Sequence, residues 1–354
     1  MRRASTVKNP YTLTFGKEPL QSISRISQHN EIIEAFEEDY ASQQIYMITG
    51  VRGMGKTVFM TSIAAYFRQK SDWIVVELNP ENDLLMALAS KLSSDHVLSG
   101  WFENAKINLS AFGLGVELSH SAPIHNIETA LSKMMESIQK KGKKLLITID
   151  EVTSTKEMRI FASAFQIFIR ENLPVYLLMT GLYENIYELK NQKSLTFLYR
   201  APRIDLRPLN IGTIAENYRQ NFNLERNDAL HMAQMTKGYS FAFQVLGYLT
   251  WKNNGNYRAV ELEYKQYLDE YVYEKIWSEL SATDKRVAYA IAQTNGGRIS
   301  DIREVLGFTN NQFNPYRQRL IRKGILDGSE YGVVTFLLPL FADYIIENYP
   351  EFEG

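Results

Sequence analysis

Between about residues 45 and 209, short apolar runs alternate with amphipathic stretches of helical period. Each run is rich in β-branched or aromatic residues and is bounded by turn residues, which is typical of strands buried on both faces. The runs are residues 45–49 (IYMIT), 73–78 (WIVVEL), 145–149 (LLITI), 175–180 (VYLLMT) and 203–209 (RIDLRPL). This alternation predicts an α/β fold in which crossover helices join the strands of a parallel sheet.

Two departures from this alternation change the picture. Residues 106–120 alternate with period two around a glycine-containing turn, which predicts an inserted β-hairpin. After residue 209 the strand signals stop and helical periodicity takes over, which predicts an α-helical lid. The helices are expected at residues 210–222, 225–236, 239–252 and 259–279.

A third pattern begins near residue 281. Helices are predicted at residues 281–294, 299–306 and about 315–323, and an apolar strand pair then flanks the turn at residues 327–332. Three helices followed by a β-ribbon is the order of a winged helix-turn-helix. The domain boundaries predicted from these changes are 1–209, 210–280 and 281–354.

Composition narrows the functional classes. The chain has 354 residues, of which 45% are hydrophobic and 22% charged, so it is globular and long enough for two or three domains. Its 39 basic and 40 acidic residues give a net charge of −1, so any nucleic-acid contact requires a local patch. The absence of cysteine excludes disulfides, thiolate metal sites and cysteine nucleophiles. The five histidines show no metal-ligand spacing.

Neither the apolar runs nor the N-terminus indicates a membrane. The longest apolar stretch, residues 333–346, is shorter than the roughly 20 residues that a bilayer requires and contains Asp343. Two arginines near the N-terminus are not followed by the apolar segment of a secretory signal. We therefore expect a soluble, cytoplasmic protein.

The strongest chemical signal is the sequence GVRGMGKT at residues 50–57, which fits G-x-x-x-x-G-K-[ST] between a predicted strand and a predicted helix. Glycines let the backbone approach phosphate oxygens, and the loop N–H groups and the helix N-terminus favour negative charge. Lys56 is expected to reach the β- and γ-phosphates, and the Thr57 hydroxyl to bind Mg²⁺. The residues predicted to contact ATP here are Gly50, Val51, Arg52, Gly53, Met54, Gly55, Lys56, Thr57 and Val58.

A second motif supplies carboxylates at the end of a buried strand. In LLITIDE, Asp150 is expected to hold Mg²⁺ through water, and Glu151 to act as the base on the attacking water. One strand, residues 73–78, lies between the two motifs in the sequence. This spacing favours the P-loop ATPases that have an added strand and a catalytic glutamate over kinases and GTPases.

Two further residues have candidate roles at the nucleotide. Thr180, at the tip of the next strand, is either a sensor of the γ-phosphate or simply the residue that ends the strand before Gly181. Arg200, just before the last strand, either stabilises transition-state charge, in its own chain or across a subunit interface, or forms a surface salt bridge.

Taken together, the motifs GVRGMGKT, LLITIDE and LLMTG and the trailing winged helix resemble the AAA+ and STAND-type ATPases. The similarity is greatest to the archaeal-type ATPase group, which is similar in turn to the origin-recognition ATPases. It implies ATP and Mg²⁺ as cofactors, ATP hydrolysis, a P-loop core at residues 1–209, a lid at 210–280 and a winged helix at 281–354.

The resemblance also implies two less specific contacts to the nucleotide. Residues 9–19, which include Pro10, resemble a strap that lies over the adenine, and Arg25 follows a few residues on. Residues 238–244 resemble the G-x-P-hydrophobic motif of such lids, although Ser240 stands where proline is usual. No arginine occurs in this segment to act as the lid sensor of the origin-recognition relatives.

The output of the C-terminal domain stays open. Residues 315–323 include four basic residues and no acidic one, with Arg319 and Arg322 expected to face outward, which suits contacts to duplex DNA. The domain as a whole has eight basic and nine acidic residues, and Asp327 and Glu330 lie in the wing turn. The first hypothesis is an ATP-hydrolysing switch that acts on DNA. The second is a slow-turnover or non-catalytic signalling module that binds ATP and grips a protein, or associates with itself.

Overall fold

The computed structural model describes residues 8–14, 19–38, 41–114, 122–294 and 296–350. The chain divides into two compact units. The sheet unit consists of residues 25–49 and 56–205, and the helical unit of residues 1–24, 50–55 and 206–354. The phosphate-loop residues 50–55 thus belong with the helical unit, although the strand before them and the helix after them belong to the sheet unit.

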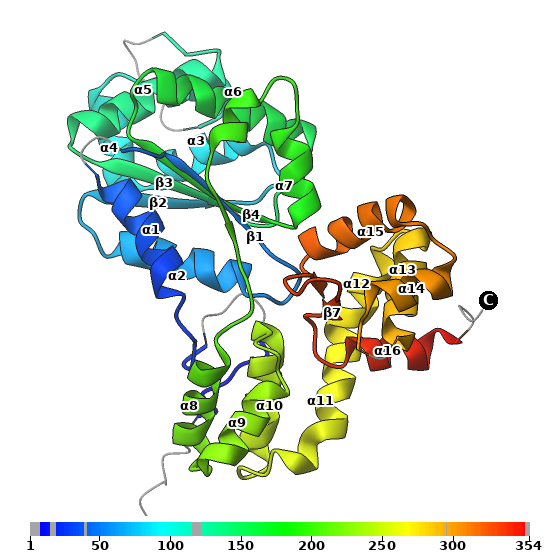
Figure 1. Ribbon diagram of the computed structural model, residues 1–354. Coiled ribbons are helices and arrows are strands. Elements are labelled where there is room, and N and C mark those ends of the chain that lie inside the picture. The colour runs from blue at the N-terminus through cyan, green and yellow to red at the C-terminus, as the bar shows by residue number, and fades with distance from the viewer. Residues whose placement is uncertain (1–7, 15–18, 39–40, 115–121, 295, 351–354) are drawn as a thin grey trace, which may run out of the picture. The chain divides into compact units, whose positions relative to one another are not determined.

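A five-stranded parallel sheet forms the centre of the sheet unit, with the strand order β2-β3-β4-β1-β5 (Figure 1). The strands are β1 (Ile45–Thr49), β2 (Trp73–Leu78), β3 (Lys144–Ile149), β4 (Val175–Gly181) and β5 (Arg203–Asp205). The prediction of a parallel sheet with crossover helices is confirmed. The fifth strand is shorter than predicted, because only residues 203–205 of the run 203–209 pair with β1.

Helices cover both faces of this sheet. They are α1 (Ile26–Glu37), α2 (Lys56–Arg68), α3 (Leu84–Ser94), α4 (His96–Asn104), α5 (Ile127–Lys140), α6 (Lys156–Arg170) and α7 (Tyr183–Lys190), with a 3₁₀ turn η2 (Thr196–Arg200) before β5. In Figure 1, α1 and α2 lie on one face, and α3, α5 and α6 lie on the other. Because successive strand residues point to opposite faces, Met47, Ile147 and Leu177 join the core beneath α3, α5 and α6.

The inserted β-hairpin predicted at residues 106–120 is not found in the part of it that the structure describes. Residues 106–114 contain the 3₁₀ turn η1 (Ser110–Phe112) and no strand, and residues 115–121 lie outside the described residues. Asn108 explains the difference in part, because its side-chain carbonyl accepts a hydrogen bond from the Ser110 N–H at 3.1 Å. Such a local turn competes with strand pairing.

The helical unit contains the helices of the predicted lid. Its helices are α8 (Ile211–Phe222), α9 (Arg226–Gln234), α10 (Ser240–Lys252), α11 (Glu261–Leu268) and α12 (Glu274–Ser278), with a 3₁₀ turn η3 (Arg258–Val260) before α11 and a π-helical turn η4 (Asp269–Tyr273) after it. The single helix predicted at residues 259–279 is therefore a succession of short segments. Among the described residues, no helix is both long and apolar enough to cross a membrane.

The C-terminal part of the helical unit contains three helices, a ribbon and a fourth helix. They are α13 (Ala282–Gln293), α14 (Ile299–Leu306), α15 (Asn310–Arg322), β6 (Leu326–Asp327), β7 (Thr335–Phe336) and α16 (Phe341–Asn348), with β6 and β7 antiparallel. This order agrees with the predicted elements, and α16 is an additional one. Assignment to the winged helices stays a prediction.

The predicted start of α15 was wrong. The helix begins at Asn310 and not near residue 315, because Thr309 caps it, and its side chain and that of Gln312 form a reciprocal capping box. Pro315 consequently lies inside the helix, where it lacks the N–H that would bond to the preceding turn. The capping box satisfies two of the free N–H groups at the helix start, which outcompetes the weaker signal of proline at a first helical position.

Candidate nucleotide site

The predicted phosphate loop connects β1 to α2 and turns sharply between them. Gly53 and Gly55 have φ angles of 73° and 88°, in the left-handed region that favours glycine, and the Met54 N–H donates to the Val51 carbonyl at 3.2 Å. Lys56, Thr57 and Val58 form the first turn of α2, where the helix N-terminus favours negative charge. This local geometry fits a loop that binds phosphate.

In the sheet unit, hydrogen bonds join the predicted metal-binding residues. The Thr57 Oγ1 hydroxyl donates to Asp150 Oδ2 at 2.7 Å, and the Thr180 hydroxyl donates to Asp150 Oδ1. Asp150 follows β3, Thr180 lies near the end of β4, and Thr57 begins α2, so three elements meet at one carboxylate. A hydroxyl beside a carboxylate is a set of hard oxygen donors, which is what Mg²⁺ prefers. These residues therefore fit the ion.

Glu151 stands next to this cluster in an unusual backbone conformation. Its φ angle is 52°, a left-handed value that costs a non-glycine residue on the order of 1–3 kcal/mol. Its N–H points to Thr180 Oγ1 at 3.1 Å and to Asp150 Oδ1 at 3.0 Å, and its side chain is exposed. Thr180, which is fully buried, thus holds both acidic residues in place. Its sensor role stays a prediction.

Arg200 lies at a different edge of the sheet. It is the last residue of η2 and precedes the amino end of β5, which runs parallel to β1 with Arg203 opposite Met47. The phosphate loop follows the carboxyl end of β1, so the two positions are at opposite edges. The Arg200 side chain is exposed. This placement argues against a contact with the nucleotide in its own chain, and a role across a subunit interface stays a prediction beside that of a surface salt bridge.

In the helical unit, the lid bonds directly to the phosphate loop. The Tyr239 hydroxyl donates to the Arg52 carbonyl at 2.6 Å, the Phe241 N–H to the Gly53 carbonyl at 2.9 Å, and the Ser240 hydroxyl to the Met54 carbonyl at 3.0 Å. Three successive carbonyls are thus bound by three successive lid residues. The sequence singled out this lid segment for contact with nucleotide, but gave no signal that it contacts the loop.

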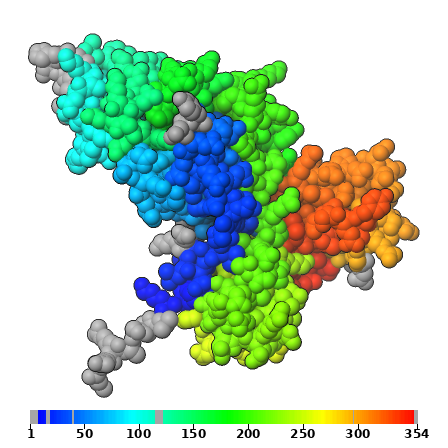
Figure 2. Space-filling model, turned by 60° about the vertical axis from the view of Figure 1, so that its left-hand side comes forward, coloured from blue at the N-terminus to red at the C-terminus, as the bar shows by residue number. Residues whose placement is uncertain are grey.

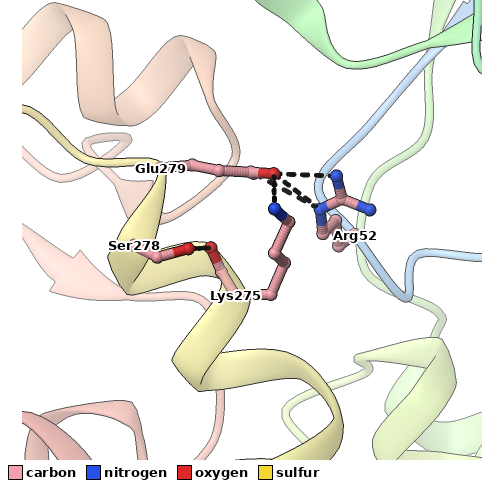
Figure 3. A network of polar contacts seen from close by, with 4 residues as sticks. All are labelled: Arg52, Lys275, Ser278 and Glu279. Carbon is pink, nitrogen blue, oxygen red and sulfur yellow. Dashed lines mark hydrogen bonds and ion pairs between the residues drawn. The ribbon is translucent and has the colours of Figure 1, made fainter.

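The Arg52 side chain of the loop is also held within the helical unit (Figure 3). Its guanidinium lies 2.8 Å from Glu279 Oε1 through Nη2, and its Nε lies 3.2 Å from the same oxygen. Lys275 approaches Glu279 at 3.5 Å. Partial burial by itself raises the pKa of the Glu279 carboxyl, but the bonds and charge of Arg52 and the charge of Lys275 outweigh it and lower that pKa. No local sequence pattern points to Glu279, because only the fold brings it to the loop.

The N-terminal strap is built into the lid. The Asn9 amide donates to the Tyr248 carbonyl at 3.1 Å, and the Pro10 carbonyl accepts from the Gln21 N–H at 3.0 Å. Tyr11 is buried against Tyr218, Phe222 and Phe243, and its hydroxyl donates to Asn217 at 2.7 Å. Figure 2 shows this blue segment against the green lid helices. The contact of Pro10 with adenine stays a prediction.

The sheet order and the motif residues at its carboxyl edge define the P-loop NTPase fold. Residues 28–189 match the ATPase domain predominantly from Archaea, and this part of the chain is an archaeal-type ATPase domain. Residues 270–345 match a domain of unknown function, DUF8462. The predicted resemblance to archaeal-type ATPases is thereby confirmed.

Solved structures share this fold. A Walker-type ATPase of Pyrococcus abyssi is 15% identical over 92% of this chain and 96% of its own, with a TM-score of 0.64. The ORC2 protein of Aeropyrum pernix, solved as ADPNP–ADP complexes, is 12% identical over 96% of each chain, with a TM-score of 0.59. No curated protein matches the amino-acid sequence.

The C-terminal arginines differ in their surroundings. Arg319 is exposed, as expected, but its guanidinium is also bound to Asp284 of α13, with Nη2 and Nε at 2.7 and 2.9 Å from Oδ1. Asp284 is only 2% exposed, and its second oxygen accepts from the Ser281 hydroxyl at 2.8 Å. Arg322, one turn further along α15, is exposed. The charge of Arg319 is therefore used within the domain.

We expect Arg319→Ala to destabilise the protein by about 1–3 kcal/mol, because it leaves the buried Asp284 carboxylate without its cationic donor. Arg322→Ala, the matched control on the same helix, should change stability by no more than about 0.5 kcal/mol. Urea unfolding of both variants measures the difference. Equal stabilities would contradict a structural role for the Arg319–Asp284 pair.

Proposed function

We propose that this protein binds ATP with Mg²⁺, hydrolyses the ATP, and uses the nucleotide state to control its C-terminal domain. The observation that carries the proposal is the hydrogen bond from Thr57, the last residue of the phosphate-loop motif, to Asp150. It unites the two motifs that P-loop ATPases use for the metal. The archaeal-type ATPase domain at residues 28–189 supports the same conclusion.

Each residue has a defined task in this proposal. The loop N–H groups and Lys56 bind the phosphates, and Thr57 and Asp150 hold Mg²⁺, directly and through water. When bound, Mg²⁺ would neutralise the charge that develops on the phosphates. Glu151, two residues beyond the end of β3, accepts the proton of the attacking water. Arg200 of a neighbouring subunit supplies positive charge in the transition state.

Two outputs of the C-terminal domain differ in the charge they require. Arg322 is exposed on α15 and suits a phosphate contact of duplex DNA. The commitment of Arg319 to Asp284, and the acidic Asp327 and Glu330 near the ribbon turn, favour a protein partner or a second copy of the chain instead. In that alternative, the protein is a signalling module that holds ATP and turns it over slowly.

Lys56→Ala should abolish most ATP binding or turnover, because Arg52, the other cation of the loop, is paired with Glu279. The measurements are a titration with fluorescent ATP·Mg²⁺ and a phosphate-release assay, with circular dichroism to verify folding. A folded Lys56→Ala protein that retains full binding and turnover would overturn the nucleotide site.

Glu151→Gln should retain ATP·Mg²⁺ binding and slow hydrolysis by about 10²- to 10⁴-fold, the range for a general base, since the amide keeps the shape but accepts no proton. Single-turnover hydrolysis separates this step from product release. Asp150→Asn is the comparison, because it should weaken the dependence on Mg²⁺. If both variants weaken Mg²⁺ binding equally and leave turnover unchanged, the assigned roles are wrong.

A titration of labelled duplex DNA, with and without ATP·Mg²⁺, decides between the two outputs. If Arg322 contacts a phosphate, affinity should fall steeply between about 50 and 200 mM salt, and Arg322→Ala should lower the slope of log affinity against log salt by about one. The absence of DNA binding by the parent protein at low salt would reject the DNA output in favour of the protein partner.

A further inference from the structure

The contacts between lid and loop fix the direction of three peptide groups. The carbonyls of Arg52, Gly53 and Met54 accept hydrogen bonds from residues 239–241. The C=O and N–H of a planar trans peptide point in opposite directions. The N–H groups of Gly53, Met54 and Gly55 are therefore directed away from these lid donors. A loop that binds phosphate needs its N–H groups directed together towards the anion.

Tyr239 makes the most constrained of these contacts. Its side chain is fully buried, and its hydroxyl donates to the Arg52 carbonyl at 2.6 Å. Burial, together with the nearby Tyr264, raises the pKa of Tyr239 above its usual value, so the hydroxyl keeps the proton that it donates. A Cβ on Gly53 would lie 2.1 Å from the Tyr239 oxygen. Gly53 is thus required both by its positive φ angle and by the close approach of this ring.

We propose that Tyr239 is a positioning residue of the phosphate loop: its hydroxyl and ring hold the loop in the phosphate-binding conformation before nucleotide arrives. The proposal rests on the ATP-binding function proposed above and adds a second requirement for binding, which lies in the lid. Its physical basis is preorganisation, since a loop that is already ordered loses less conformational entropy on binding.

Ser240 gives this segment a second feature that fits the same role. The motif that residues 238–244 resemble implies a proline at the position of Ser240, and a proline has no hydroxyl to donate. In this chain the Ser240 hydroxyl donates to the Met54 carbonyl at 3.0 Å, which extends the contact to a third loop residue. At the position where the sequence departs from the motif, Ser240 therefore adds a hydrogen bond to the loop.

The test compares two variants, each of which removes the hydroxyl of one buried tyrosine in the lid. Tyr239→Phe removes the bond to the Arg52 carbonyl and keeps the ring. Tyr264→Phe is the matched control, because Tyr264 is also buried in the lid and its hydroxyl donates to a backbone carbonyl, that of Met235, at 3.0 Å, and not to the loop. Both variants should lose similar stability in urea unfolding. Titrations use fluorescent ATP·Mg²⁺ and the full-length chain.

We expect Tyr239→Phe to bind ATP about 5- to 100-fold more weakly than the parent, the factor that corresponds to one unsatisfied carbonyl acceptor, and Tyr264→Phe to bind as the parent does. Equal affinities of the two variants, or tighter binding by Tyr239→Phe, would overturn the proposal. Tighter binding would mean that the lid restrains the loop against nucleotide.

A second measurement separates this proposal from the proposed function. Hydrogen exchange of the loop amides at residues 51–55 is recorded without nucleotide, and it should be faster in Tyr239→Phe and unchanged in Tyr264→Phe. If the parent protein binds no ATP, the proposed function fails, and the exchange still reports whether Tyr239 orders the loop. If the parent binds ATP but exchange and affinity are the same in both variants, only the role of Tyr239 is rejected.

Discussion

The carboxyl edge of the parallel sheet is the constraint on which the candidate site depends. Because β1, β3 and β4 run in the same direction, the residues that follow them leave the sheet on the same side. The phosphate loop follows β1, Asp150 follows β3, and Thr180 lies near the end of β4. Hydrogen bonds from two hydroxyls to one carboxylate then connect α2, β3 and β4. The same direction rule separates Arg200 from this edge, since it precedes its strand.

The phosphate loop has a second set of contacts, in the helical unit. Its carbonyls accept bonds from the lid, and Arg52 pairs with Glu279, which lies between α12 and α13. The ion pair is partly exposed, so it contributes on the order of 0.2–1 kcal/mol, whereas the Tyr239 contact is buried and leaves an unsatisfied carbonyl if removed. Loop, lid and the start of the C-terminal helices are thereby connected through one short segment.

In the C-terminal helices, packing determines which basic side chains are available to a partner. Arg319 and Arg322 belong to the same basic stretch and both are exposed, yet Arg319 also pairs with the buried Asp284. A carboxylate buried near the start of α13 requires a cationic or hydrogen-bonding partner, and α15 supplies it. A count of basic residues on a helix therefore overstates the charge that is available to a partner.

The sequence by itself determined the five strands, the helical lid, the phosphate-loop motif and the polar residues at the carboxyl edge of the sheet. The periodicity of hydrophobic residues and the spacing of glycines are local properties of a sequence. It did not determine the structure of residues 106–114 or the start of α15, where short polar side chains bond to their own backbone. Three pairings were decided only by the tertiary structure: Tyr239 with the Arg52 carbonyl, Glu279 with the Arg52 guanidinium, and Asp284 with Arg319. Each pair joins residues at least 35 positions apart, and no local pattern records which distant side chain the fold brings into contact.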